Sequence, residues 1–376
     1  MELVLDVETT TFNKGNPYDS RNSLVSVHAH HEGTSKSYRP SEMESVAEVV
    51  RQATEVIFFN AKFDLTWLRR TGLRIDDVPL WDVQLAHFIL RYQSVPFPSL
   101  DDVLTFYGLP LKFDKVKELW GKGVQTDQID WDILCEYGEG DVEKTYQCYL
   151  RQKEEFKNSP QLYKVFKLTC KDTYVLQEME WNGLKYNSEG CAKKSEELQG
   201  AIDQIIADLS AIYPGVHINF GSNDQLSAFL YGGVIKEEVR THIGFYKTGQ
   251  KVGQPRYSVG EIEHALPRLF EPLRGSEMAK ENVFSTDEST LRKLKGKNKW
   301  IVDKLLELAK LDKLNNTYYK GLNKINSDMY WEKDTLHPQY NQCRVQTGRL
   351  SSSKPNSQNM SSDILDIFES RYDSTN

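Results

Sequence analysis

The chain has 376 residues, a formal net charge of −7 and 39% hydrophobic residues, so it can form about two or three domains with their own cores. No run of about 18 apolar residues occurs and Met1 leads into a charged residue, so we expect no membrane span, no signal peptide and a cytoplasmic location. The five cysteines are odd in number and lack CxxC spacing, which argues against a disulfide framework or a zinc site.

Charge is unevenly distributed along the chain. Residues 1–155 contain 17 Lys and Arg against 26 Asp and Glu, whereas residues 156–376 contain 30 against 28. An acidic region suits metal chemistry, and a basic cluster such as residues 292–299 suits phosphate binding. A solvated loop or helix end explains that basic cluster equally well.

The first acidic motif lies near the N-terminus, in residues 3–10. Its apolar, β-prone residues predict a strand, and the i, i+2 spacing places Asp6 and Glu8 on the same face. Two adjacent carboxylates repel each other, and a divalent cation with oxygen ligands, Mg²⁺ or Mn²⁺, would offset that repulsion. The alternative is an edge strand with solvated carboxylates.

The following segments predict a mixed order of strands and helices. Residues 24–30 alternate as a second strand, and Ser41 with Glu44 forms a candidate capping box for a helix. Residues 56–59 read as the next strand. This order is typical of a layered α/β sheet with helices packed on it.

The second acidic motif, Asn60 to Asp64, opens a helix just after a buried strand. Active sites of α/β folds favour that location, although Asp64 could equally serve as a helix-terminal carboxylate. Helix capping or an exposed position accounts for several other polar residues nearby. These are Asp82, His87, Asp101 and Asp102.

The third motif, Tyr137 and Asp141, has the i, i+4 spacing that places two residues on one face of a helix. Farther along, residues 156–215 have helical spacing, residues 246–257 read as a mobile loop or ribbon, and a long helix is expected from about residue 300 to 319. The polar residues 336–360 have the composition of a flexible loop.

Together the three motifs supply four carboxylates and one tyrosine. Such a group is stable if it binds two divalent ions, which can activate a water molecule and stabilise the charge on a scissile phosphate and its leaving 3′ oxygen. Tyr137 would position the water or help to deprotonate it. No local signature suggests a Ser-His-Asp or Cys-His nucleophile.

In this order and within one domain's length, the three motifs resemble those of the DEDDy group of 3′→5′ exonucleases, which have a ribonuclease H-like fold. The resemblance implies that the carboxylates are metal ligands, that Tyr137 orients the water, and that two further residues hold the 3′-terminal nucleotide. The implied ligands are Asp6, Glu8, Asp64 and Asp141, and the implied nucleotide contacts are Thr9 and Asn60.

The second half resembles the thumb and early palm of family A DNA polymerases, and the phage-type branch fits best. The resemblance is carried by residues 179–183, 219–226, 284–287, 313–318 and 346–359. It implies an α/β exonuclease domain in residues 1–155, followed by a mainly helical thumb and an incomplete palm in residues 156–376. It also implies DNA contacts by Lys313, Arg349, Gln358 and Asn359.

The palm aspartates and the fingers helix expected of a polymerase do not occur, so we expect no polymerisation by this chain alone. We expect a proofreading exonuclease that binds a single-stranded 3′ end and clamps a primer–template, in the host cytoplasm if the source is a phage. The missing parts would come from a C-terminal polymerase chain, and residues 246–257 are a candidate site for a processivity factor. The alternatives are a DNA-clamping and docking subunit of a split polymerase, and an RNA-trimming nuclease.

Overall fold

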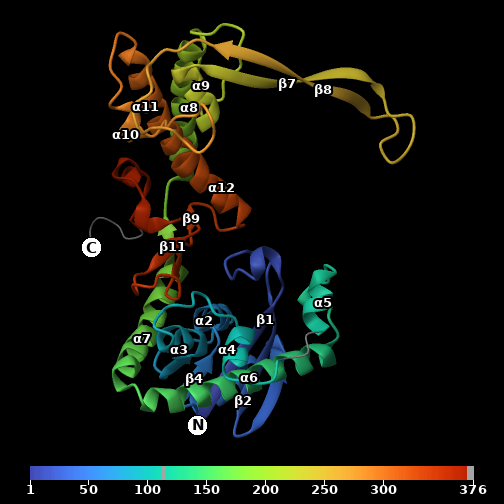
Figure 1. The fold of residues 1–376 in the computed structure, drawn as a ribbon. Coiled ribbons are helices and arrows are strands. Elements are labelled where there is room, and N and C mark those ends of the chain that lie inside the picture. The colour runs from blue at the N-terminus through green and yellow to red at the C-terminus, as the bar shows by residue number, and fades with distance from the viewer. Residues whose placement is uncertain (112–114, 371–376) are drawn as a thin grey trace. The chain divides into compact units, whose positions relative to one another are not determined.

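The computed structural model describes residues 1–111 and 115–370, which form two compact units (Figure 1). Unit 1 combines Met1–Ser188 with the chain from Leu322 onwards, and unit 2 is Glu189–Gly321. The sequence-based division between residues 155 and 156 lies inside helix α6 (Trp131–Lys157). That division assigns family domains and stays a prediction.

A five-stranded sheet forms the centre of unit 1, in the order β3-β2-β1-β4-β5. The strands are β1 (Glu2–Thr9), β2 (Leu24–His31), β3 (Thr34–Tyr38), β4 (Glu55–Phe58) and β5 (Leu80–Asp82). β1, β2 and β3 pair antiparallel, whereas β4 is parallel to β1 and to β5. The predicted mixed α/β architecture is confirmed.

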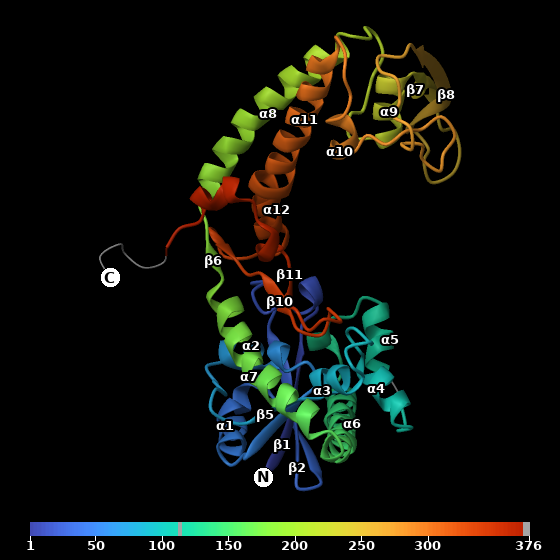
Figure 2. The same ribbon diagram turned by 60° about the vertical axis from the view of Figure 1, so that its left-hand side comes forward.

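Helices cover the sheet, as Figure 2 shows. The unit 1 helices are α1 (Met43–Arg51), α2 (Ala61–Arg70), α3 (Val83–Leu90), α4 (Leu100–Phe106), α5 (Lys115–Gly121), α6 and α7 (Pro160–Asn182), and α12 (Lys320–Asp328) begins at its border. The predicted capping box of Ser41 and Glu44 is wrong. Glu42 is the N-cap of α1 without a side-chain cap bond. Its carboxylate instead accepts a hydrogen bond from the backbone N–H of Arg39 at 2.8 Å across the preceding 3-10 turn, where Pro40 fixes the first position.

Residues after Leu322 complete unit 1. Strand β6 (Leu184–Lys185) pairs with β9 (Thr335–Leu336), and β10 (Gln339–Asn341) pairs with β11 (Ser351–Ser353). Residues 336–360 therefore contain a small hairpin, not only the flexible loop that their composition suggested. Short 3-10 turns follow at Ser357–Asn359 and Ser362–Ile367.

A buried carboxylate joins the two sequence segments of unit 1. Glu180, at the end of α7, accepts hydrogen bonds from Lys62 Nζ on α2 and from the backbone N–H of Tyr340 on β10. Nearby, Gly183 has φ +62°, and a Cβ there would lie 2.5 Å from the carbonyl oxygen of Leu336. Only glycine tolerates both that φ and that approach.

Unit 2 is mainly helical, as the sequence predicted. Its helices are α8 (Ser188–Ser210), which begins at the unit border, α9 (Asn223–Tyr231), α10 (Glu288–Leu291) and α11 (Lys299–Lys313), followed by a π turn at Leu314–Tyr319. Within the π turn, buried Asn315 accepts from Ser195 Oγ at 2.6 Å and donates to Gln199 Oε1 at 3.2 Å. The predicted long helix therefore changes its winding where Asn315 bonds to α8.

A two-stranded arm extends from the helices of unit 2 (Figure 1). It consists of β7 (Gly233–Phe245) and β8 (Pro255–Leu266). The sequence indicated a loop or ribbon only for residues 246–257, and the ribbon is longer because both flanking segments are extended. Among the described residues, no helix is both long and apolar enough to cross a membrane.

Candidate active site

The carboxylates of β1 lie on the sheet face that α6 covers. Asp6 and Glu8 pair in register with His28 and Ser26 of β2, so alternation along the strand places all four on one face. Asp141 of α6 lies opposite. One ligand oxygen from each of Asp6, Glu8 and Asp141 lies within 4.8 Å of the others.

The packing of α6 on β2 sets the position of this helix. A Cβ on Gly138 would lie 2.2 Å from His28 Cδ2, so the helix approaches the imidazole at a position where no other residue fits. His28 is buried and lies between Ser26 Oγ at 2.8 Å and Ser37 Oγ at 2.9 Å. Burial lowers the pKa of His28 to about 4, which keeps it neutral beside the carboxylates.

The fourth carboxylate comes from α2, which begins beyond the end of β4. Asp64 is 2% exposed, and its Oδ1 accepts a hydrogen bond from Val7 N at 3.0 Å. Burial, and then the charge of Asp6, raises the pKa of Asp64 well above its ordinary value. A bound cation would reverse that shift, because it favours the ionised form of its ligands.

Tyr137 lies one helical turn before Asp141 on α6. Its ring is half-buried and packs edge-on against Trp120 of α5, with ring centroids 5.9 Å apart. Trp120 Nε1 in turn donates to Thr126 Oγ1 at 3.1 Å. The sequence predicted neither partner, because α5 has no signal that relates it to α6.

Thr9 and Asn60, the predicted nucleotide contacts, lie at the ends of β1 and β4. Thr9 is buried, and a Cβ on Gly15 would lie 2.5 Å from its Oγ1. Asn60 is exposed and has left-handed backbone angles, φ 63° and ψ 56°. Asparagine tolerates this conformation better than most residues do.

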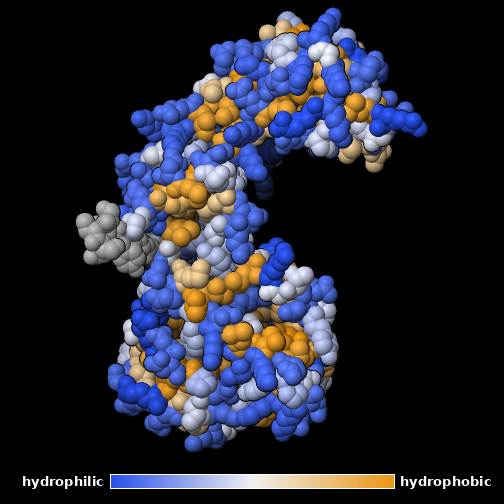
Figure 3. Space-filling model, turned by 90° about the vertical axis from the view of Figure 1, so that its left-hand side faces the viewer, coloured by the Kyte–Doolittle hydropathy of each residue, from blue (hydrophilic) through white to orange (hydrophobic). Residues whose placement is uncertain are grey.

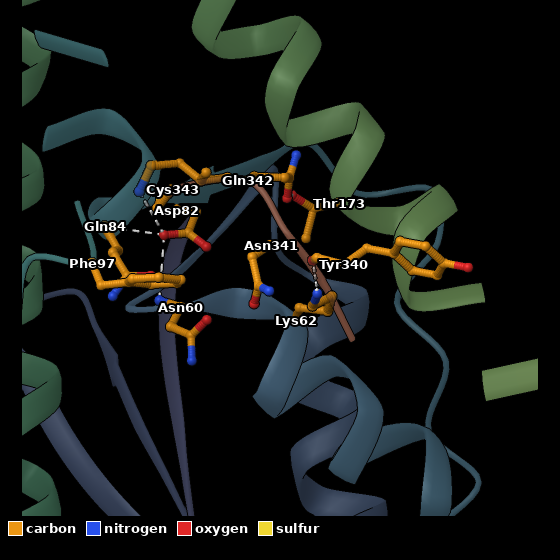
Figure 4. A pocket seen from close by; sticks show the side chains of 11 residues that line it. Asn60, Lys62, Asp82, Gln84, Phe97, Thr173, Tyr340, Asn341, Gln342 and Cys343 are labelled. Carbon is orange, nitrogen blue, oxygen red and sulfur yellow. Dashed lines mark hydrogen bonds between the residues drawn. The ribbon is translucent and has the colours of Figure 1, made fainter. Parts of the chain in front are cut away.

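Asp82 holds the backbone of Asn60, which sequence reasoning missed. It caps α3 as predicted, but it is 3% exposed, and its carboxylate also accepts from the backbone N–H of Asn60 at 3.3 Å (Figure 4). The same carboxylate accepts from the backbone N–H of Ala61 at 2.8 Å. His87, expected as a cap or an exposed residue, is also buried. The only sequence signal was the position of Asp82 at a strand end.

A small cleft of about 60 Å³ adjoins Asn60. Figure 4 shows Lys62 and Asp82 on its walls, with Tyr340 and Gln342 contributed by the segment around β10. The four candidate metal ligands do not line this cleft. The carboxylate group therefore defines the candidate site, and the cleft lies beside Asn60.

The predicted DNA contacts of the second half are all exposed. Lys313 ends α11 in unit 2, whereas Arg349, Gln358 and Asn359 belong to unit 1. Arg349 lies in the loop between β10 and β11, and the other two lie in a 3-10 turn. Exposure is compatible with a binding role, which stays a prediction for each of them.

Two family models match the chain. Residues 2–157 match the 3′-5′ exonuclease family, and residues 258–371 match DNA polymerase family A. The chain carries a 3′-5′ exonuclease domain and a family A DNA polymerase region. Members of such an exonuclease family use divalent metal ions, and the carboxylate group lies within the matched residues.

Two known DNA polymerases align with most of this chain. The exonuclease domain and polymerase region are similar to DNA polymerase I of Bacillus subtilis, with 28% identity over 80% of this chain and 29% of the relative. DNA polymerase of Bacillus phage SP01 is 26% identical over 82% of this chain and 34% of its own. The chain thus spans about a third or less of the length of these relatives.

The fold is also similar to a solved structure. The POL domain of Pol1 from M. smegmatis, in complex with DNA primer-template and dNTP, aligns with a TM-score of 0.67 and 17% identity. The alignment covers 96% of this chain and 52% of that one. At this identity the similarity supports the fold, an exonuclease domain followed by a polymerase-like helical region.

Proposed function

We propose that this chain is a metal-dependent 3′→5′ exodeoxyribonuclease that serves proofreading in DNA replication. The observation that carries the proposal is the convergence of carboxylates from β1 and α6, with ligand oxygens of Asp6, Glu8 and Asp141 within 4.8 Å of one another. Asp64 adds a fourth carboxylate against the backbone of β1. A buried group of this charge favours hard divalent cations.

Each residue of the site has a proposed role. Asp6, Glu8, Asp64 and Asp141 would hold two Mg²⁺ or Mn²⁺ ions, which when bound lower the pKa of the attacking water and stabilise the scissile phosphate and leaving 3′ oxygen. Tyr137 orients the water through its hydroxyl, and its contact with Trp120 restricts the ring. Thr9 and Asn60 hold the terminal nucleotide, and Asp82 fixes the backbone of Asn60.

We further propose that the polymerase region binds a primer–template duplex through Lys313, Arg349, Gln358 and Asn359. Their exposure and the family A match over residues 258–371 support this role. Cationic and amide side chains suit phosphates and minor-groove acceptors, which they contact without reading sequence. A phage-type origin is supported by the similarity to the phage SP01 polymerase.

The exonuclease proposal is tested on a 5′-labelled single-stranded DNA with Mg²⁺. We expect a ladder of products shortened from the 3′ end, no products in EDTA, and a rate reduced by about 10²- to 10³-fold in Asp141→Asn. Asp132→Asn on the same helix is the matched control, because Asp132 is exposed in the first turn. Activity retained in Asp141→Asn would refute the site, and faster cleavage of RNA would favour the RNA-trimming alternative.

A second candidate function is docking of a separate polymerase chain. Along α7, several apolar side chains are 45% to 61% exposed, and Figure 3 shows hydrophobic patches on the side of the molecule where this helix lies. They are Val165, Leu168, Val175 and Met179. A hollow of about 400 Å³ between α3, α7 and Leu350 adjoins them. Exposed apolar faces of this kind favour binding of a partner.

The docking function is tested by mixing the chain with a separately produced polypeptide that carries a family A palm and fingers. We expect nucleotide incorporation by the mixture and by neither component alone. Leu168→Glu with Val175→Glu should abolish incorporation and leave 3′→5′ hydrolysis intact. Incorporation unaffected by the double change would contradict docking on α7.

A further inference from the structure

The β7–β8 arm separates its charges along its length. From Val239 to Gly260 the sequence contains four Lys or Arg residues and no Asp or Glu. They are Arg240, Lys247, Lys251 and Arg256. The base of the arm instead carries four glutamates, Glu237, Glu238, Glu261 and Glu263. The distal part is therefore purely cationic.

Ion pairs of the arm are confined to its base and the residue just beyond it. Lys236 pairs with Glu261 at 3.3 Å and Glu263 at 3.1 Å, and Arg240 pairs with Glu238 at 2.9 Å. Within the part of the chain that the structure describes, no carboxylate pairs with Lys247, Lys251 or Arg256. Three cations therefore face solvent around the tip.

Aromatic rings lie on one face of the same distal part. His242 opposes Tyr257 in the strand register, and ring centroids lie 5.6 Å apart for that pair and 5.2 Å apart for His242 and Phe245. Phe245 is 59% exposed and Tyr257 is 50% exposed. Exposed rings among unpaired cations are typical of surfaces that bind nucleic acids.

The arm has little packing of its own. Only Ile235 and Leu266, at the base, join the core of unit 2. An isolated two-stranded ribbon is marginally stable in water, and β7 alone has 13 residues, a length of about 40 Å. A ligand bound along the distal part would therefore stabilise this ribbon, whose apolar side chains are exposed to solvent.

We propose that the distal arm, Val239–Gly260, binds the phosphate backbone of DNA. The ligand is inferred from charge, because cations without carboxylate partners are complementary to a polyanion. Each Lys or Arg that neutralises a phosphate also releases counterions from DNA. The aromatic face supplies apolar contacts beside the backbone. The proposal depends on the proposed function only in that the ligand is DNA. It does not depend on hydrolysis at the carboxylate site.

The test measures binding of the full chain to a 30-base-pair primer–template in EDTA, between 50 and 200 mM salt. The variant is Lys247→Gln, Lys251→Gln, Arg256→Gln. Loss of three phosphate contacts lowers the slope of log affinity against log salt by about 2.7, so the wild type should lose about 40-fold more affinity over that range than the variant does.

The matched control removes three exposed cations of unit 1, through Arg51→Gln, Lys157→Gln and Lys164→Gln, and should keep the wild-type slope. A second variant replaces residues 239–260 by Asn-Gly, which joins the paired Glu238 and Glu261 by a two-residue turn. It should reproduce the altered slope whether or not the substitutions disturb the arm.

An unchanged slope in both arm variants overturns the proposal, and the arm would then suit an acidic protein partner instead. Equal changes in the arm and control variants also overturn it, because net charge alone would explain them. The exonuclease assay on the wild type separates the two proposals. If the wild type hydrolyses DNA and the arm variants keep the wild-type salt slope, only the proposal for the arm is refuted. If the arm variants have an altered salt slope and the wild type does not hydrolyse DNA, only the nuclease proposal is refuted.

Discussion

The carboxylate site and the β7–β8 arm each gather charge of one sign, at opposite extremes of burial. Glu8, Asp64 and Asp141 are at most 9% exposed and lie on elements that belong to one packed core. The tip cations Lys247, Lys251 and Arg256 are exposed on a ribbon without a core. A group of like charges is therefore buried in one region and exposed to solvent in the other.

Burial makes the contributions of charges strongly interdependent, whereas exposure makes them small and nearly independent. In the core, low dielectric strengthens every interaction, and the pKa of Asp64 already responds to Asp6. On the arm, solvent and salt screen each cation separately. We therefore expect loss of function in one large step at the carboxylate site and in gradual steps along the arm.

The largest effect is expected for the double change Asp6→Ala, Glu8→Ala. The rate of 3′ hydrolysis at saturating Mg²⁺ should fall by more than about 10³-fold, because two ligands of the site are removed. Stability to urea in EDTA should not fall, because the change relieves repulsion between carboxylates. Glu44→Ala with Glu48→Ala, two exposed positions of α1, is the control. A double variant that loses activity and is also less stable to urea in EDTA would contradict the prediction, because unfolding would then explain the loss.

A smaller effect is expected from Gly138→Ala. The added Cβ would lie 2.2 Å from His28, so α6 must shift and carry Tyr137 and Asp141 with it. We expect about a 10²-fold slower hydrolysis and a loss of about 1 to 3 kcal/mol in the free energy of unfolding.

Gly140→Ala is the control for that change, because its added Cβ meets nothing within 4 Å on the same helix. It should stabilise the fold slightly and leave the rate unchanged, since alanine favours a helix over glycine. Stopped-flow hydrolysis and thermal unfolding distinguish the two variants. Equal rates in both would show that the contact of α6 with His28 does not position the site.

The contrast between buried and exposed groups also predicts a pH dependence. Burial, with a contribution from Arg91, lowers the pKa of His87 from 6.5 to about 4, so the unfolded chain binds the proton more readily. Its contribution to stability is complete above about pH 6.5 and is lost as pH falls toward 4, by about 3 kcal/mol.

Urea unfolding at pH 7.5 and pH 4.5 measures this loss. His87→Leu should make it smaller, although His28 would still contribute, because burial shifts its pKa in the same direction. His242→Leu on the arm, where the imidazole is exposed, is the control. A pH dependence identical in the wild type and His87→Leu would refute the assignment.

The smallest effect is expected from Lys236→Gln at the base of the arm. Lys236 pairs with Glu261 and Glu263, and solvent surrounds all three side chains. We therefore expect no measurable change in the denaturant midpoint. The salt dependence of DNA binding should also stay at the wild-type value. If Lys236→Gln lowered the salt slope of DNA binding as much as the loss of one tip cation does, the position of a charge along the arm would be unimportant.

Local spacing predicted much of the carboxylate site. Asp6 and Glu8 share a face because a strand has period two, and Tyr137 and Asp141 share one because a helix repeats near four. Their convergence depends on strand order, which local patterns do not contain. For the same reason the bonds of Asp82 to the backbone of Asn60 were missed.

The arm was only partly predicted because its strands bury no face. Alternation of apolar and polar residues marks a strand with one packed side, and β7 and β8 have none beyond Ile235 and Leu266. The error at α1 has a different cause. Ser41 and Glu44 fit a capping pattern, but the Glu42 carboxylate bonds to the backbone N–H of Arg39, and α1 begins directly after Glu42.

The bonds of Glu180 have a consequence for the order of folding. Its partner Lys62 precedes it, but Tyr340 follows it by 160 residues. At elongation rates of about 5 to 20 residues per second, this second partner is synthesised about 8 to 30 seconds after Glu180. Unit 2 is made entirely within that interval. Unit 1 therefore gains this contact last, although most of the unit is synthesised first, and a ribosome-bound chain stopped before residue 340 would carry Glu180 without its second bond.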